Sequence, residues 1–318
     1  MNHIKEINNS YLRIKNLIYK TPLIESKFLN EKLNSRIFLK CENLQKTGSF
    51  KLRGAINFIS QIKGNKTLVA PSSGNHAQAV AEAASIYNMN SILVMPKDSP
   101  EIKVEGVVKS GGKIKFYDRF KENRETIAKS LVKELNGILI PPYDDFNIIH
   151  GQGTIGLESI NQLKEINVIP DLVLCCCGGG GLISGISLIL KNEWPEIKIH
   201  PVEPENWNDT QLSLQKGKRI ELKKNIKSIC DALLAKVPGE ITFNLNKELL
   251  SKGLTVSDNQ VLNSINFAYK HLKIVIEPGG AVALTSVLNN QKLIKNKKVL
   301  VIISGGNIDN KVFKKALS

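Results

Sequence analysis

Residues 171–185 of the chain read DLVLCCCGGGGLISG, and this stretch decides the fold. Its first seven residues, 171–177, form an apolar run with the length of a buried strand. Four glycines follow at 178–181, and the stretch 182–192 then has the length and apolar content of a helix. A buried strand that passes through a glycine loop into a helix is typical of α/β proteins with parallel sheets.

Similar apolar runs recur along the chain and alternate with longer helical patterns. Strands are predicted at 36–40, 67–71, 91–96, 113–117, 138–142, 171–177, 198–204, 254–257 and 299–304. Helices are predicted at 55–62, 76–87, 124–135, 155–166, 182–192 and 259–272. At 318 residues the chain is long enough for two α/β lobes, each an open, mostly parallel sheet flanked by helices. We assign residues 1–66 and 145–318 to a large domain and residues 67–144 to a small one.

The chain carries 44 Lys and Arg residues against 29 Asp and Glu residues, a formal net charge of +15. Such an excess is compatible with nucleic-acid binding. Nearly all of it comes from lysines spread over every segment, and no aromatic side chains alternate with them as a base-stacking surface requires. A solvated, lysine-rich surface is therefore the preferred interpretation, and nucleic-acid binding is a remote alternative.

The compartment is predicted from what the sequence lacks and from its cysteines. No apolar stretch approaches the roughly 20 residues that cross a bilayer, and residues 1–16 have no apolar core of a secretory signal. Cysteines stand at positions 41, 175, 176, 177 and 230, and three consecutive thiols suit neither a disulfide framework nor a zinc site. We expect a cytoplasmic protein without membrane contact.

Three predicted strands end in glycine- or serine-rich clusters, at residues 71–76 (PSSGNH), 178–181 (GGGG) and 304–307 (SGGN). In open α/β sheets, ligands bind outside the carboxyl ends of the strands. The sequence therefore predicts that the three clusters share one pocket.

Two of these clusters and one lysine carry candidate chemistry. The backbone N–H groups of Gly178 to Gly181 suit a phosphate at a helix N-terminus, although a flexible loop can have the same sequence. Ser72 and its neighbours suit a carboxylate, although Ser before Gly-Asn is also a common helix cap. Lys51 lies between two apolar residues, as a catalytic amine with a lowered pKa would, although most single lysines are surface residues.

Five ordered motifs resemble the serine/threonine dehydratase and serine racemase family of pyridoxal-phosphate enzymes. They are ENLQKTGSFKLRGA (42–55), PSSGNHAQA (71–79), CGGGGLISG (177–185), EPGGAVAL (277–284) and SGGNID (304–309). The resemblance runs from Thr21 to Asn307 and implies a tryptophan-synthase-β-like fold with the cofactor between the lobes. Related cysteine synthases usually carry Asn-Thr where this chain has Asn75-His76, which favours the dehydratase branch.

The resemblance also implies roles for individual residues. Lys51 would bind pyridoxal 5'-phosphate covalently and accept the proton from Cα. Asn75 would donate to the 3-oxygen of the ring, and Ser304 would face the pyridine nitrogen. Gly178, Gly179, Gly180 and Gly181, with Leu182, would hold the phosphate. Substrate binding is expected from Ser72, Ser73 and His76.

The implied reaction is elimination of water from a hydroxy amino acid of the L-threonine or L-serine type, which yields a 2-oxo acid and ammonia. Ser73 leaves an alternative open, because serine racemase-like sequences carry a serine there that exchanges a proton opposite the lysine. The alternatives are a serine or aspartate racemase, alone or combined with dehydratase activity. Some dehydratases of hydroxyaspartate-like substrates also carry Ser-Ser-Gly-Asn-His, and a non-catalytic relative is a further alternative.

The stretch VEPENWNDT (202–210) matches a cation site. Glu203 and Asp209, with the backbone carbonyl of Trp207, would supply the oxygen ligands that suit Mg²⁺ or Ca²⁺, although two acidic residues in a loop are more often only solvated. The sequence ends soon after residue 309. By the resemblance, we therefore expect an enzyme without the C-terminal regulatory domain of biosynthetic threonine dehydratases. A catabolic enzyme that forms a homodimer is the expectation.

Overall fold

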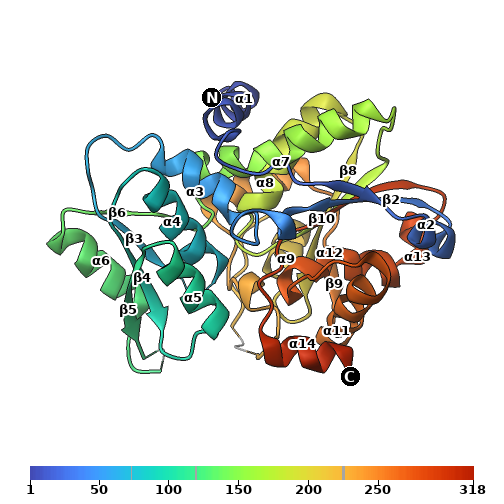
Figure 1. Cartoon of the computed structure of the whole chain (residues 1–318). Helices are drawn as coiled ribbons and strands as arrows, with labels where there is room; N and C mark the ends of the chain where they lie inside the picture. Colours follow the sequence, from blue (N-terminus) through green and yellow to red (C-terminus); the bar gives the residue numbers. More distant parts are fainter. Residues whose placement is uncertain (73, 119, 224–225) are drawn as a thin grey trace.

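The computed structural model describes residues 1–318 except 73, 119 and 224–225, and it has two lobes (Figure 1). The larger lobe is built on a six-stranded sheet in the order β1-β2-β10-β7-β8-β9. All neighbours in this sheet are parallel except β1, which pairs antiparallel with β2. The strands are β1 (Leu23–Glu25), β2 (Arg36–Cys41), β7 (Leu172–Cys176), β8 (Lys198–Pro204), β9 (Leu254–Val256) and β10 (Lys298–Ile303).

Helices cover both faces of the large sheet. Figure 1 shows α7 and α8 above it and α11 and α12 below it, and α12 contacts β7, β8 and β10. The helices are α1 (His3–Ile14), α2 (Lys27–Leu33), α7 (Phe146–Glu165), α8 (Gly181–Glu193), α9 (Asp209–Lys216), α10 (Glu240–Leu249), α11 (Asp258–Phe267), α12 (Pro278–Asn289), α13 (Gln291–Ile294) and α14 (Asn310–Leu317). Short helical segments are η1 (Glu42–Leu44), η2 (Asp231–Leu233) and the π-helical η3 (Ala268–Leu272).

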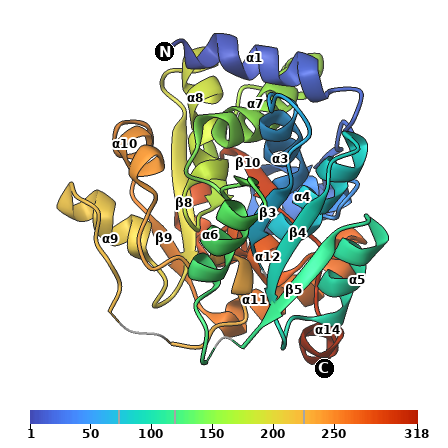
Figure 2. The same cartoon turned by 90° about the vertical axis from the view of Figure 1, so that its left-hand side faces the viewer.

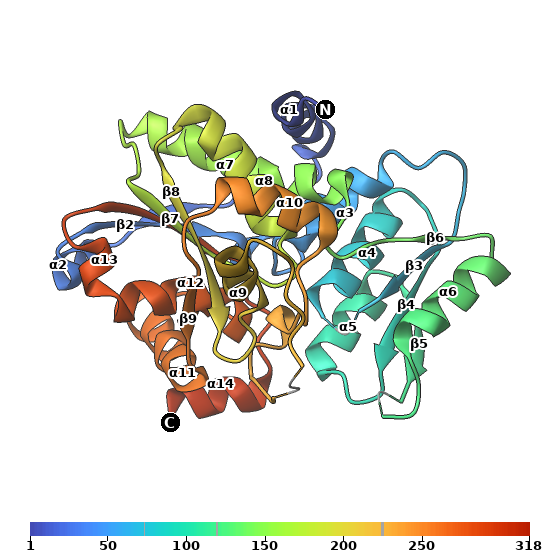
Figure 3. The same cartoon turned by 180° about the vertical axis from the view of Figure 1, so that it is seen from behind.

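The smaller lobe is a four-stranded parallel sheet in the order β5-β4-β3-β6, covered by helices on both faces. Helix α6 packs on the outer face, while α3, α4 and α5 lie on the side toward the large lobe (Figures 2 and 3). The strands are β3 (Leu68–Pro71), β4 (Ser91–Pro96), β5 (Lys113–Tyr117) and β6 (Ile138–Leu139), and the helices are α3 (Lys51–Ile59), α4 (Asn75–Ile86), α5 (Glu101–Lys109) and α6 (Arg124–Glu134).

The predicted fold class is confirmed, and the deviations have local causes. Strand β6 covers only two residues of the predicted 138–142, because Pro141 and Pro142 have no N–H to donate to a ladder. Helix α7 begins at Phe146 rather than near residue 155. In this additional first part of the helix, a Cβ on Gly151 would lie 2.7 Å from the carbonyl oxygen of Arg53, and a Cβ on Gly153 would lie 2.9 Å from that of Gly185. The glycines allow α7 to pack closely against α3 and α8.

The division of the chain into domains stays a prediction. The two sheets are formed by separate parts of the chain, with β3 to β6 lying within 67–144. Helix α3, which we assigned to the large domain, packs against both lobes. Its Leu52 and Ile56 belong to the apolar cluster of α4 and β3 in the small lobe, and α3 also contacts α7 of the large lobe. The packing therefore supports a small-domain boundary before α3 as well as the one at residue 66.

Candidate active site

A cavity of about 210 Å³ lies between the two lobes, beyond the carboxyl ends of β3, β7 and β10. The three glycine- and serine-rich clusters that follow these strands all line it, which confirms that they share one pocket. Described residues of the predicted site on its wall are Lys51, Ser72, Asn75, His76, Gly178, Gly179, Gly180, Gly181, Leu182 and Ser304. Ser73 lies outside the described residues.

Lys51 is the first residue of α3, and its amine points into this cavity. Nζ donates a hydrogen bond to the carbonyl oxygen of Pro142 at 2.6 Å and lies 5.1 Å from the ring centroid of Phe50. Burial lowers the pKa of Lys51 to about 8. A substantial fraction of the amine is therefore neutral near physiological pH, as condensation with an aldehyde requires.

The glycine loop joins β7 to α8 and can hold only glycine at two of its positions. Gly180 has φ +99°, which disfavours any residue with a side chain. A Cβ on Gly179 would lie 2.3 Å from a ring carbon of Tyr143. The loop ends at the N-terminus of α8, where backbone N–H groups have no intrahelical acceptor, so it suits an anion such as phosphate.

Asn75 begins α4 and is held by two side chains from the large lobe. Its Nδ2 donates to the carboxylate of Glu277, and its Oδ1 accepts a hydrogen bond from Asn307 Nδ2 at 2.9 Å. Burial raises the pKa of Glu277 to about 7, so this carboxyl takes up a proton more readily than usual. The amide is thereby fixed at the wall of the cavity.

Ser72 lies in the loop after β3, and His76 is the second residue of α4. His76 Nε2 lies 3.0 Å from the carbonyl oxygen of Ile140, so this nitrogen carries the ring proton. Burial first, and then the Lys51 ammonium, lower the pKa of His76 to about 3, so the imidazole is neutral. Ser72 Oγ accepts from the N–H of Gly74 at 3.3 Å.

Ser304 follows β10 on the wall opposite the small lobe. Its Oγ accepts a hydrogen bond from the thiol of Cys176 at 3.2 Å, and its carbonyl oxygen accepts from the N–H of Phe50 at 3.1 Å. The backbone bond ties Ser304 to the residue that precedes Lys51. Its hydroxyl is neutral, in contrast to a carboxylate at such a position.

Glu203 and Asp209 come together outside the cavity lining, and both are fully buried. Glu203 accepts from the N–H groups of Thr210 and Gln211 at 2.9 and 2.8 Å, whereas both carboxylate oxygens of Asp209 have no hydrogen-bond partner among the described residues. Burial raises the pKa of Asp209 to about 8 and that of Glu203 well above its usual range. Within the described chain, no group of three His, Cys, Asp or Glu side chains suits a metal. The indole of Trp207 donates to the carbonyl oxygen of Ile226 at 2.8 Å.

Several residues of the cavity were missed at the level of sequence. Arg124, from the first turn of α6, and Tyr143 line it. Lys103 of α5 is buried and forms an ion pair with Asp231 of η2, so this contact joins the two lobes. These single charged or aromatic residues lie outside any motif, so the sequence did not indicate that they line the cavity. Only the tertiary fold brings their segments together.

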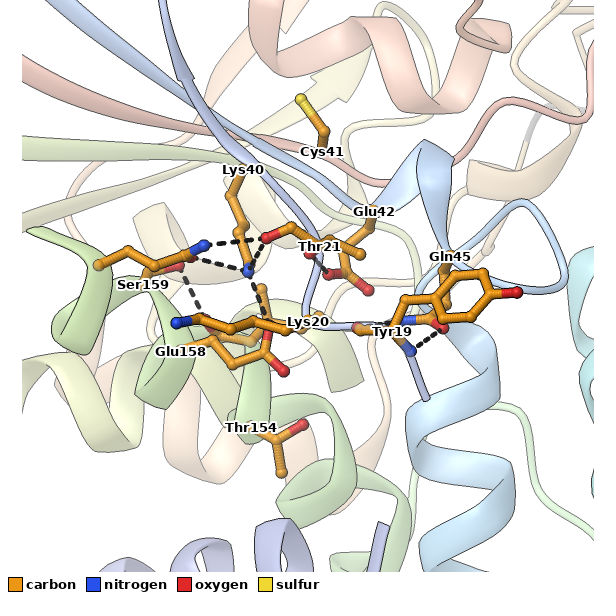
Figure 4. A network of polar contacts seen from close by, with 12 residues as sticks. Tyr19, Lys20, Thr21, Lys40, Cys41, Glu42, Gln45, Thr154, Glu158 and Ser159 are labelled. Carbon is orange, nitrogen blue, oxygen red and sulfur yellow. Dashed lines mark hydrogen bonds and ion pairs between the residues drawn. The ribbon is translucent and has the colours of Figure 1, made fainter. Parts of the chain in front are cut away.

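Four buried charged residues contact one another, and we call Lys40, Glu42, Arg53 and Glu158 the buried quartet. Figure 4 shows Lys40, Glu42 and Glu158 of this group. Arg53 donates to both oxygens of Glu42 at 2.8 Å and to those of Glu158 at 2.8 and 2.9 Å. Lys40 Nζ donates to Glu158 at 2.7 Å. The quartet connects β2, η1, α3 and α7 two residues from Lys51, and its positive and negative charges balance.

Comparison with known proteins identifies the family. The sequence profile of pyridoxal-phosphate-dependent enzymes matches residues 14–305. The chain belongs to this family. Its cavity fits the cofactor of these pyridoxal-phosphate-dependent enzymes, because a buried amine with a lowered pKa faces a glycine loop at a helix N-terminus.

Individual relatives in this family cover nearly the whole chain. L-threo-3-hydroxyaspartate ammonia-lyase of Saccharomyces cerevisiae is 38% identical, with 96% of this chain and 93% of the relative covered. Serine racemase of Schizosaccharomyces pombe is 37% identical, with 93% and 91% covered. The crystal structure of a threonine deaminase from T.th. superposes with a TM-score of 0.91 at 36% identity, over 96% of this chain and 98% of that one. The predicted resemblance is confirmed.

Two further observations concern the surroundings of the protein. Among the described helices, none is both long and apolar enough to cross a membrane. All five cysteines are free and buried. No disulfide constrains the fold in the part of the chain that the structure describes.

Proposed function

We propose that this pyridoxal-phosphate enzyme eliminates water from a hydroxy amino acid of the L-threonine or L-serine type and releases a 2-oxo acid and ammonia. The observation that carries the proposal is the meeting of Lys51, the glycine loop and the Ser304 hydroxyl in one cavity. When bound, the cofactor supplies an electron sink for the bonding electrons that the leaving proton gives up. Two relatives support this proposal through their names: an L-threo-3-hydroxyaspartate ammonia-lyase at 38% identity and a serine racemase at 37% identity, both of which act on amino acids that carry a β-hydroxyl group.

Each residue of the cavity is assigned a role from its chemistry and its position. Lys51, with a pKa near 8, holds the cofactor aldehyde and then takes the proton from Cα at Nζ. Gly178 to Gly181 and Leu182 hold the phosphate with backbone N–H groups at the start of α8. Asn75 donates to the 3-oxygen of the ring. Ser72, Ser73 and His76 are assigned to the substrate carboxylate. Neutral His76 supplies no counter-charge, because its ring proton is donated to the carbonyl oxygen of Ile140.

Ser304 faces the pyridine nitrogen in this assignment. A hydroxyl, unlike an aspartate, does not force that nitrogen to take up a proton. With Ser304 at that position, the bound cofactor would withdraw less negative charge from Cα, which would favour loss of the β-hydroxyl. The choice of serine therefore favours elimination over reactions that need a long-lived carbanion.

The function is tested by incubating the cofactor-loaded protein with L-serine, L-threonine, L-threo-3-hydroxyaspartate and their D-forms. Ammonia and 2-oxo acid are expected in equal amounts from at least one L-substrate, and L-alanine, which has no leaving group, is the control. Absence of both products with every substrate would refute the proposal.

The side chain of the substrate is the part of this proposal with the fewest supporting observations. Arg124 favours a substrate with a second carboxylate. Arg124 lines the cavity with its Nε bonded to Glu125 at 2.8 Å, and a guanidinium can also bind a second carboxylate through two parallel hydrogen bonds. A second carboxylate on the substrate, as in hydroxyaspartate, would fit this group. In the substrate panel, Arg124→Met is expected to raise KM for hydroxyaspartate more than KM for serine.

Racemisation of serine or aspartate is the alternative function, and Ser73 discriminates it. If Ser73 exchanges a proton opposite Lys51, Ser73→Ala is expected to remove racemisation and dehydration of D-substrates. Dehydration of the L-substrate should largely survive, because Lys51 alone takes that proton. The measurement is the chirality and deuterium content of substrate recovered from D₂O. Equal loss of L-dehydration would instead assign Ser73 to binding or to the elimination itself.

We further propose that Glu203 and Asp209, with the Trp207 carbonyl, bind Mg²⁺ or Ca²⁺. The unpartnered oxygens of buried Asp209 support this, because a buried carboxylate without a partner is costly and a hard cation takes oxygen ligands. A cation that binds only the folded state stabilises it by about 2.7 kcal/mol at a hundredfold excess over its dissociation constant.

The cation prediction is an increase in melting temperature on adding Mg²⁺ or Ca²⁺ to EDTA-treated protein. Asp209→Asn is the matched variant: it keeps the shape of the side chain but cannot ionise to a carboxylate ligand, so its melting temperature should not respond to the cation. A wild type whose melting temperature and rate ignore both EDTA and cation has no such site.

We also propose that the protein is a cytoplasmic homodimer. A homodimer is supported by the family resemblance, and sedimentation equilibrium of the cofactor-loaded protein would measure it. A cytoplasmic location is supported by the five free thiols, because a reducing compartment preserves them.

A further inference from the structure

The three consecutive cysteines at the end of β7 differ in what their thiols contact. The thiol of Cys175 donates to the carbonyl oxygen of Cys176 at 3.4 Å, and that of Cys177 lies 3.3 Å from the hydroxyl of Thr210. Only the middle thiol of the three reaches Ser304, at 3.2 Å. Cys176 also lines the cavity that contains Lys51.

The direction of this hydrogen bond determines what Ser304 can do. A serine hydroxyl has one proton to donate and lone pairs with which to accept. When the thiol of Cys176 donates to Oγ, the hydroxyl proton of Ser304 remains available to another acceptor. The Ser304 backbone is fixed by its bond from Phe50, so turning the hydroxyl is the freedom that remains.

We propose that Cys176 is a positioning residue: its thiol donates to Ser304 Oγ and so directs the Ser304 proton toward the ring nitrogen of the cofactor. The proposal rests on the function above, in which Ser304 faces that nitrogen. A ring nitrogen that accepts from Ser304 stays unprotonated. Cys176 thus acts on the ring through Ser304, without touching the reacting atoms.

The variants follow from the contacts. Cys176→Ala removes the donor, and Cys176→Ser restores one, since a hydroxyl donates as a thiol does. Cys175→Ala is the matched control, because it also removes one fully buried thiol of β7 but none that lines the cavity or contacts Ser304. Melting temperatures show whether each variant is folded before it is compared.

The main readout is the ¹⁵N chemical shift of the ring nitrogen in protein reconstituted with labelled pyridoxal phosphate. The wild type, Cys175→Ala and Cys176→Ser are expected to show the unprotonated nitrogen, and Cys176→Ala a shift toward the protonated value. Turnover should fall by about fivefold in Cys176→Ala, the factor that one modest hydrogen bond supplies, and recover in Cys176→Ser.

Two results would overturn the inference: a protonated ring nitrogen in the wild type, or a signal that Cys176→Ala leaves unchanged. Ser304→Ala separates this failure from that of the site assignment. If Ser304→Ala moves the signal and Cys176→Ala does not, only the role of Cys176 is wrong. If neither moves it, Ser304 does not contact the nitrogen, while ammonia release still tests the proposed elimination independently.

Discussion

Lys51→Ala is expected to lower turnover by about 10⁴-fold or more, because the variant loses both the covalent attachment of the cofactor and the base at Cα. The visible absorbance of the lysine-bound cofactor should disappear with it. Lys46→Ala is the control, since Lys46 belongs to the same motif but is exposed beside Tyr19 and does not line the cavity. A Lys51→Ala protein that kept absorbance and activity would show that another amine binds the cofactor.

The lowered pKa of Lys51 gives this prediction a pH dependence. Only the neutral amine adds to an aldehyde, and the neutral fraction grows as the pH rises through about 8. The rate at which cofactor-free protein takes up pyridoxal phosphate should therefore increase with pH and level off above about pH 8. Continued increase toward pH 10 would indicate an amine with the ordinary pKa of a solvated lysine.

Arg53→Met is expected to reduce the free energy of unfolding by about 3–5 kcal/mol, because it leaves Glu42 and Glu158 buried with Lys40 as their remaining positive partner. The shift of the urea midpoint measures the effect. Arg36→Met is the matched control: Arg36 also makes two hydrogen bonds to a single glutamate, Glu25, but at the surface. Its expected cost is about 0–1 kcal/mol.

A second variant tests the reason for this loss. Arg53→Met combined with Glu158→Gln removes one of the uncompensated buried charges and should recover part of the lost stability. Equal destabilisation by Arg53→Met and Arg36→Met would mean that burial of the quartet has no energetic consequence. Because Arg53 is two residues from Lys51, cofactor affinity should fall with stability in Arg53→Met and not in Arg36→Met.

The sequence by itself determined the features that are local in the chain. The run of apolar residues, four glycines and a helix at 171–193 specifies a strand, an anion-binding loop and a helix through neighbouring residues alone. The alternation of such units predicted the parallel sheets, and the clusters at the strand ends predicted a shared pocket. The family resemblance added Lys51 to that pocket, and the cavity is lined by Lys51, Asn75 and Ser304. The prediction extended β6 over two prolines that have no N–H for the ladder, and it missed the first part of α7, where glycines permit close packing against α3 and α8.

The tertiary structure decided the partners of these residues. Glu277 reaches Asn75 across 202 positions, Cys176 reaches Ser304 across 128, and Lys103 reaches Asp231 across 128. The quartet likewise joins four separate segments, each of which alone has an ordinary charged residue. A hydrogen bond or ion pair depends on distances of a few ångströms between side chains, and a periodic pattern carries no such distance. Only the packed tertiary structure determines what each side chain contacts. These contacts in turn set the pKa of the side chain and the direction of its hydrogen bonds.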